Sequence, residues 1–115
     1  MKVRRSFPFE AAHRLPRHPG KCRDLHGHSY RLVVTVERPV EPASGMAIDF
    51  GDLKEVVHRE VLRALDHKCA NDVLENPTAE LLAVWIWQRL TAPLPGLVEI
   101  ELHETRTCSV VYRGE

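Results

Sequence analysis

Three histidines near the N-terminus have the residue type and the spacing of a metal site. His26 and His28 flank Gly27, and in an extended backbone residues two apart point to the same side. His13 ends the preceding apolar segment, and the short connection to the next segment predicts that the two pair as antiparallel strands. Three neutral imidazole nitrogens with one open position are typical of catalytic zinc, whereas a structural site is closed by four protein ligands. The spacing therefore predicts Zn²⁺ held by His13, His26 and His28.

Cys22 lies between these histidines and leaves two interpretations open. As a thiolate ligand it would close the site and leave no room for substrate. As a free thiol beside a metal-bound substrate it would act as a nucleophile or a general base, because a nearby cation favours the thiolate form.

Three further segments carry groups that could transfer protons or hold a substrate. Asp66 and His67 are adjacent, and a carboxylate beside an imidazole fixes its tautomer and supports proton transfer. The alternative is that Asp66 only ends a helix and His67 interacts with the helix dipole. Glu104 could accept two hydrogen bonds from an amidine-like ring edge, or simply be solvated. Thr78 is expected to be a helix cap first and a ligand second.

The elements that must position these residues follow from hydrophobic periodicity. Alternating apolar residues predict strands over 3–13, 30–37, 98–103 and 109–113. Apolar residues at three- and four-residue steps predict a helix after Asp49, which can cap it, and a second helix after Asn76 or Thr78. The second helix ends before Pro93, and the residues that it is expected to bury are Leu81, Leu82, Trp85, Ile86 and Leu90.

The order strand, strand, helix, helix, strand, strand predicts an α+β fold. We expect an antiparallel four-stranded sheet with two helices on one face, in the order ββααββ. Such a sheet has two open edges, and open edges favour pairing with copies of the same chain. We therefore expect a homo-oligomer.

Composition limits the classes of function. At 115 residues the chain is long enough for one domain, residues 1–115. The 16 basic and 16 acidic residues cancel, so we expect no nucleic-acid partner. No apolar stretch approaches the roughly 18 residues of a membrane span, and no apolar signal core follows the basic start. The 3 cysteines have no framework spacing, so a reduced, cytoplasmic protein is expected.

Six short segments together resemble the family of 6-pyruvoyl-tetrahydropterin synthase and 6-carboxy-tetrahydropterin synthase. They occur in the family's order and span nearly the whole chain: Phe9–His13, Cys22–His28, Met46–Phe50, Leu65–Lys68, Asn76–Glu80 and His103–Thr105. The resemblance implies the T-fold, in which three four-stranded sheets close into a barrel and two barrels stack as a hexamer, a dimer of trimers. It also implies zinc on His13, His26 and His28.

The resemblance implies roles for the other candidate residues. Cys22 would be the proton-abstracting base, and Asp66 with His67 would be the second proton-transfer pair. Glu104 would anchor the pterin ring, and Thr78 would assist it. Sites in this family lie between subunits, so the Cys22 and His67 of one site can belong to different chains.

The three residues between Cys22 and His26, and the closing segment Val111–Glu115, resemble the bacterial carboxy-forming branch. That branch converts a small-molecule pterin triphosphate, 7,8-dihydroneopterin triphosphate, to 6-carboxy-5,6,7,8-tetrahydropterin with release of acetaldehyde and triphosphate, in 7-deazaguanine and queuosine biosynthesis. The resemblance therefore implies a carbon–carbon and carbon–oxygen lyase. The alternatives are a 6-pyruvoyl-tetrahydropterin synthase and, from another class, a non-catalytic zinc-binding module closed by Cys22.

Overall fold

A computed structural model describes residues 1–115 and contains one five-stranded sheet in the order β3-β1-β2-β4-β5. The two long strands β1 and β2 form an antiparallel pair over their whole length, and β4 and β5 continue this antiparallel arrangement. The short β3 lies beside the end of β1 and runs parallel to it. The strands are β1 Lys2–His13, β2 His26–Glu37, β3 Lys68–Cys69, β4 Leu97–His103 and β5 Ser109–Tyr112.

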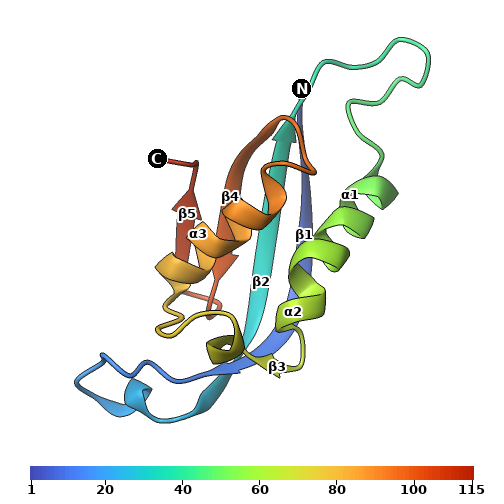
Figure 1. The fold of residues 1–115 in the computed structure, drawn as a ribbon. Helices are drawn as coiled ribbons and strands as arrows, with labels where there is room; N and C mark the ends of the chain where they lie inside the picture. The colour runs from blue at the N-terminus through green and yellow to red at the C-terminus, as the bar shows by residue number, and fades with distance from the viewer.

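The helices lie on one face of this sheet (Figure 1). One helical segment runs through α1 (Phe50–Val57), a π-helical turn η2 (His58–Leu62) and α2 (Arg63–Leu65), and the other is α3 (Ala79–Leu90). Short 3₁₀ turns η1 (Lys21–Arg23) and η3 (Ala70–Asp72) lie in the connections. Asp49 caps α1, because its carboxylate accepts the amides of Gly51 and Asp52. No helix has both the length and the apolar character that a membrane span requires.

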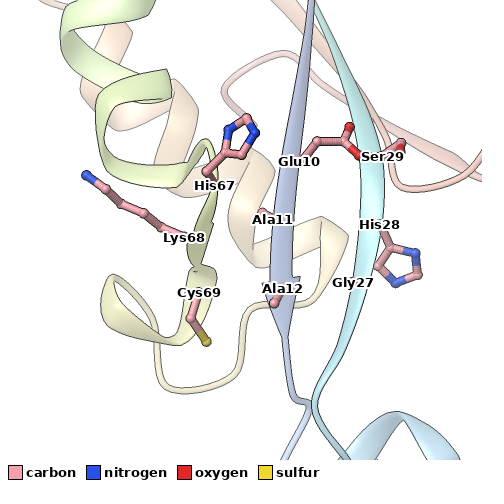
Figure 2. Close-up of a pocket in the computed structure, with 9 residues that line it drawn as sticks. All are labelled: Glu10, Ala11, Ala12, Gly27, His28, Ser29, His67, Lys68 and Cys69. Atoms are coloured by element: carbon pink, nitrogen blue, oxygen red, sulfur yellow. Dashed lines mark hydrogen bonds between the residues drawn. The ribbon is translucent and has the colours of Figure 1, made fainter.

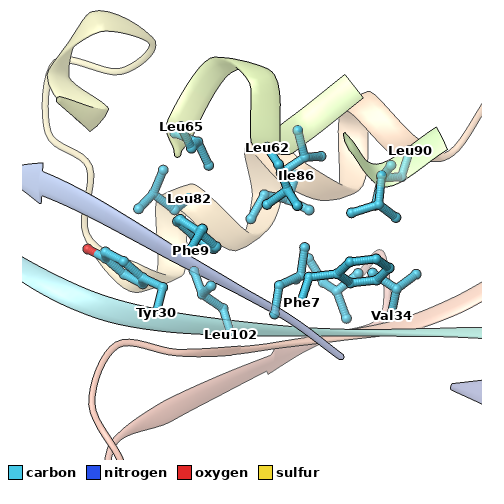
Figure 3. Packing of buried hydrophobic residues seen from close by; sticks show 14 of the residues in the cluster. Phe7, Phe9, Tyr30, Val34, Leu62, Leu65, Leu82, Ile86, Leu90 and Leu102 are labelled. Carbon is cyan, nitrogen blue, oxygen red and sulfur yellow. The ribbon is translucent and has the colours of Figure 1, made fainter. Parts of the chain in front are cut away.

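The core lies between the helices and one face of the sheet (Figure 3). Its members come from β1, β2 and β4 below and from the helical segments above, as the strand and helix periods predict. Phe9 and Tyr30 face each other across β1 and β2, and their rings stack at a centroid distance of 4.9 Å. Tyr30 is the first core residue of β2 and follows His28 by two positions, so the apolar core directly adjoins the histidines.

The opposite face of the sheet is uncovered and charged. Glu99 joins Arg4 and Arg113 there, at 3.2 and 2.8 Å, and Arg4 also donates to the Thr35 hydroxyl at 3.2 Å. These long side chains cover Thr35, which is only 2% exposed.

Two expectations from the sequence are wrong in part. The sheet has five strands and is mixed, not four antiparallel strands, because the chain leaving α2 runs along β1 and pairs with it at Ala11 and Ala12. Two residues are too few to show a strand period. The expected burial of Leu81 is also wrong, since it is 45% exposed, and Trp85 only packs against the margin of the core. The remaining strands, both helices and the capping residues Asp49 and Thr78 are confirmed.

Candidate metal centre

The register of β1 and β2 brings the three histidines together on the helix-covered face. His13 lies opposite His26, and Ala11 lies opposite His28, so all three rings project from neighbouring positions of the same face. One ligand atom of each ring lies within 4.8 Å of those of the other two. The side chains of His13, His26 and His28 therefore form the group that their spacing predicts.

In two of the three rings, those of His13 and His26, a backbone carbonyl fixes which nitrogen carries the proton. His13 Nδ1 lies 2.9 Å from the Pro77 carbonyl oxygen, and His26 Nδ1 lies 2.7 Å from the Asp24 carbonyl oxygen. A carbonyl oxygen only accepts, so both Nδ1 atoms donate and both Nε2 atoms carry lone pairs. These two Nε2 atoms face each other at 3.0 Å. Two lone pairs at that distance repel, and a cation between them converts the repulsion into ligation.

The donor set fits Zn²⁺, which prefers neutral imidazole nitrogens held by a hydrogen bond at the other ring nitrogen. Burial favours the neutral ring: it lowers the pKa of His13, and the neighbouring His26 and His28 lower it further, against the Pro77 and Glu104 contributions that raise it. A neutral His13 leaves its Nε2 lone pair available for a metal.

Tyr30 lies beneath this group and was not singled out from the sequence. Its hydroxyl is 3.3 Å from His13 Nδ1, and its ring packs edge-on against those of His13 and His28. Burial, followed by the Glu104 carboxylate, raises the pKa of Tyr30 above its ordinary value, so the phenol stays protonated. Its position two residues after His28 on the same strand face was the available signal.

Glu104 is the candidate residue that the fold places against the histidines. It follows β4, and its Oε1 lies 3.4 Å from His13 Nε2 and 3.5 Å from His28 Nε2. Thr78 is linked to the histidine group through its neighbour Pro77, whose carbonyl holds His13. Its own hydroxyl caps α3 by accepting the Leu81 amide. One short segment thus begins α3 and orients a metal ligand.

Cys22 lies in η1, half-buried, in the connection between β1 and β2. It is not a member of the group whose ligand atoms lie within 4.8 Å of one another. The backbone of this connection is held by a hydrogen bond from the Leu15 amide to the Cys22 carbonyl at 2.8 Å.

Asp66 and His67 lie at the outer edge of β1 and do not join the histidine group of the same chain. Asp66 accepts the Glu10 amide at 2.9 Å and contacts His67 Nδ1 at 3.0 Å, while the His67 amide donates to the Glu10 carbonyl at 2.6 Å. These bonds hold His67 at a φ of 60°, a left-handed conformation that is uncommon outside glycine. The His67 side chain is 79% exposed.

His67 borders a shallow hollow of about 480 Å³ on the uncovered face. Figure 2 shows His67 and Lys68 on the outer side of β1, whereas the ring of His28 lies beyond β2. The small residues Ala12 and Gly27 leave this space, and Glu10 accepts a hydrogen bond from Ser29 at its margin, at 2.6 Å. His28 belongs both to the lining of this hollow and to the histidine group, so the hollow reaches the metal group at His28 and reaches His67 on its other side.

Sequence reasoning missed the two carbonyls that orient the rings, at Asp24 and Pro77. A backbone carbonyl carries no signal in the residue type, so only the fold reveals its direction. It also missed Glu10, whose backbone holds Asp66 and His67 in place.

The fold and the site together define the class of protein: an α+β domain with three converging histidines at the end of its central strands. The family model described as 6-pyruvoyl tetrahydropterin synthase matches residues 2–115. The chain belongs to the 6-pyruvoyl tetrahydropterin synthase family.

Individual relatives are similar over nearly the whole chain. A 6-carboxy-5,6,7,8-tetrahydropterin synthase from Synechocystis sp. is 44% identical over 117 residues, which cover 96% of this chain and 91% of the relative. The human 6-pyruvoyl tetrahydrobiopterin synthase is 36% identical over 135 residues, with 99% and 92% covered. The solved structure of the Caenorhabditis elegans 6-pyruvoyl tetrahydropterin synthase superposes with a TM-score of 0.90 at 27% identity, covering 100% of this chain and 96% of that one.

Proposed function

We propose that the chain is a zinc-dependent lyase that converts 7,8-dihydroneopterin triphosphate to 6-carboxy-5,6,7,8-tetrahydropterin, with release of acetaldehyde and triphosphate. The observation that carries the proposal is the convergence of three imidazoles. In two of them, His13 and His26, a backbone carbonyl holds Nδ1 and leaves the other ring nitrogen for a metal. Membership of a pterin synthase family makes a pterin the substrate class. The product would serve 7-deazaguanine and queuosine biosynthesis in the cytoplasm, from a single domain of residues 1–115.

The metal would supply a Lewis acid for the side-chain hydroxyls of the substrate. His13, His26 and His28 would hold it, and Glu104 would accept the ring N–H and amino group of the pterin. Cys22, which is near the histidines in the chain but outside their ligand group, would remove a carbon-bound proton. Asp66 would orient His67, which would return protons to the ring. No NAD or flavin is required, because reduction of the ring is matched by oxidation of the side chain.

Two observations favour the carboxy-forming reaction over the pyruvoyl-forming one. The Synechocystis relative, which is named as a carboxy-forming enzyme, is 44% identical to this chain, whereas the human relative, named as a pyruvoyl-forming enzyme, is 36% identical. The gap of three residues between Cys22 and His26 also resembles that of the carboxy-forming branch. Incubation of the purified protein with 7,8-dihydroneopterin triphosphate tests the choice. Acetaldehyde together with a carboxypterin product supports the proposal, and a pyruvoyl product without acetaldehyde contradicts it.

The active oligomer would be a hexamer in which each site forms between chains. The exposed His67 at the outer edge of β1, apart from the histidine group of its own chain, supports this arrangement. A neighbouring copy that pairs with the free edge of β1 would bring its own metal group beside His67.

A non-catalytic zinc module remains the alternative of another class. It requires Cys22 as a fourth ligand, but Cys22 lies outside the group of converging ligand atoms. Replacement Cys22→Ala separates the two. The enzyme retains its zinc and loses turnover, whereas a closed structural site loses its zinc.

A further inference from the structure

We propose that Glu104 is a displaceable fourth ligand of the metal, which it releases when the pterin ring binds. The inference rests on the proposed function, because the second half of the exchange needs a pterin. It adds one carboxylate, from the turn after β4, to the converging group of three histidines, two of which that carboxylate contacts.

The position of the Glu104 carboxylate matches a ligand of the same ion. In a tetrahedral zinc site with bonds of about 2.0–2.2 Å, neighbouring ligand atoms lie about 3.3–3.5 Å apart. Glu104 Oε1 lies 3.4 Å from His13 Nε2 and 3.5 Å from His28 Nε2. The same oxygen is thus at ligand–ligand distance from two imidazole nitrogens that belong to different strands.

A plain hydrogen bond explains this contact less well for His13. Its Nδ1 carries the ring proton, which the Pro77 carbonyl accepts at 2.9 Å. Its Nε2 lone pair therefore faces the Glu104 oxygen, and two acceptors at 3.4 Å repel each other. A shared cation turns both contacts into bonds.

Glu104 is also placed where it can move. It lies at the start of the turn between β4 and β5, and its side chain is 26% exposed, whereas His13 is fully buried. The backbone at Glu104 is fixed by a hydrogen bond from its amide to the Cys108 carbonyl at 3.1 Å. The side chain can therefore change rotamer without a change of the strand pair, exchanging the metal for a ring edge that offers two donors.

A cobalt titration tests the ligand role without any turnover. The metal-stripped wild type, Glu104→Gln and Glu101→Gln are titrated with Co²⁺, and visible absorption reports the coordination while a competing chelator gives the Kd. Glu101→Gln is the matched control, because Glu101 lies on β4 close to Glu104 and contacts a histidine at 3.0 Å, but that histidine, His103, is not a member of the metal group. We expect Glu104→Gln to weaken Co²⁺ binding by about tenfold or more and to change the spectrum. Unchanged affinity and spectrum would overturn the inference.

A second measurement on the wild type tests the exchange even if Glu104→Gln does not fold. Unsubstituted pterin has the amidine ring edge but no side-chain hydroxyls that could reach the metal. When pterin fluorescence shows it bound, we expect the Co²⁺ spectrum of the wild type to change; an unchanged spectrum, or no binding of pterin, rules out the exchange. The acetaldehyde assay fails or succeeds independently of both readouts, so a wrong ligand assignment and a wrong function are distinguishable.

Discussion

At the scale of single residues, the candidate metal site depends on His13 remaining neutral, with its proton on Nδ1. His13 is buried among apolar residues and next to two other imidazoles, so the folded, metal-free chain resists its protonation. The Nδ1–H of the same ring is held by Pro77. Burial and a carbonyl therefore prepare His13 for a metal before any metal arrives.

This environment predicts how metal-free stability depends on pH. As pH falls below the ordinary histidine value of 6.5, the unfolded chain binds a proton at His13 while the folded chain, with its lowered pKa, does not. Unfolding is therefore favoured at acidic pH, and stability is regained above 6.5. We expect the urea midpoint of the chelator-treated protein to fall over this range, and to fall less in His13→Gln. An equal fall in both proteins would contradict the assignment.

His67 predicts a separation of stability from activity. Its φ of 60° costs an L-residue about 1 kcal/mol that glycine does not lose. We expect His67→Gly to abolish turnover without lowering the free energy of unfolding. His58→Gly, at a right-handed helical position, should instead destabilise by about 1 kcal/mol. Urea unfolding measures both, and a large destabilisation by His67→Gly would show that the ring, not the backbone, is structurally important.

At the scale of elements, the start of α3 couples folding to the metal group. Thr78 caps the helix, and the preceding Pro77 supplies the carbonyl that holds His13. We expect Thr78→Ala to lower the free energy of unfolding by about 1 kcal/mol and to weaken metal binding, since Pro77 is then less firmly held. Thr78→Ser should restore both properties. Lost stability with unchanged metal affinity would separate the cap from the site.

The elements also explain how far the sequence alone could go. Strands β1 and β2 alternate strongly enough to give their period and, through it, the shared face of His26 and His28. The position of β3 could not be predicted, because its two residues pair with β1 through the bonds of Glu10 to Asp66 and His67. The proximity of Glu104 to His13 is likewise set by the register of β4 on β2, a contact between distant segments.

At the scale of the whole molecule, a single chain leaves one charged face of the sheet uncovered and its strand edges largely unpaired. The outer edge of β1 is paired only at Ala11 and Ala12, and β5 forms the other edge of the sheet. Pairing of these edges between copies would close a ring and enclose the ion pairs of Glu99.

A mixing experiment tests whether sites are shared between chains. Cys22→Ala and His67→Ala should each be inactive, but oligomers refolded from an equal mixture contain sites in which both residues are intact. For random assembly we expect about a quarter of the wild-type activity. A mixture of Asp66→Ala and His67→Ala, which alter the same chain edge, should stay inactive. Failure of the first mixture to recover any activity would place Cys22 and His67 in one chain.

The most direct test of the central claim is the metal content of the purified protein and of variants at the three imidazoles. We expect one zinc ion per chain in the wild type and a loss of zinc in His13→Ala, His26→Ala and His28→Ala, with the fold retained by circular dichroism. Full zinc content in these variants, or no bound metal in an active wild type, would contradict a site built on the ends of β1 and β2.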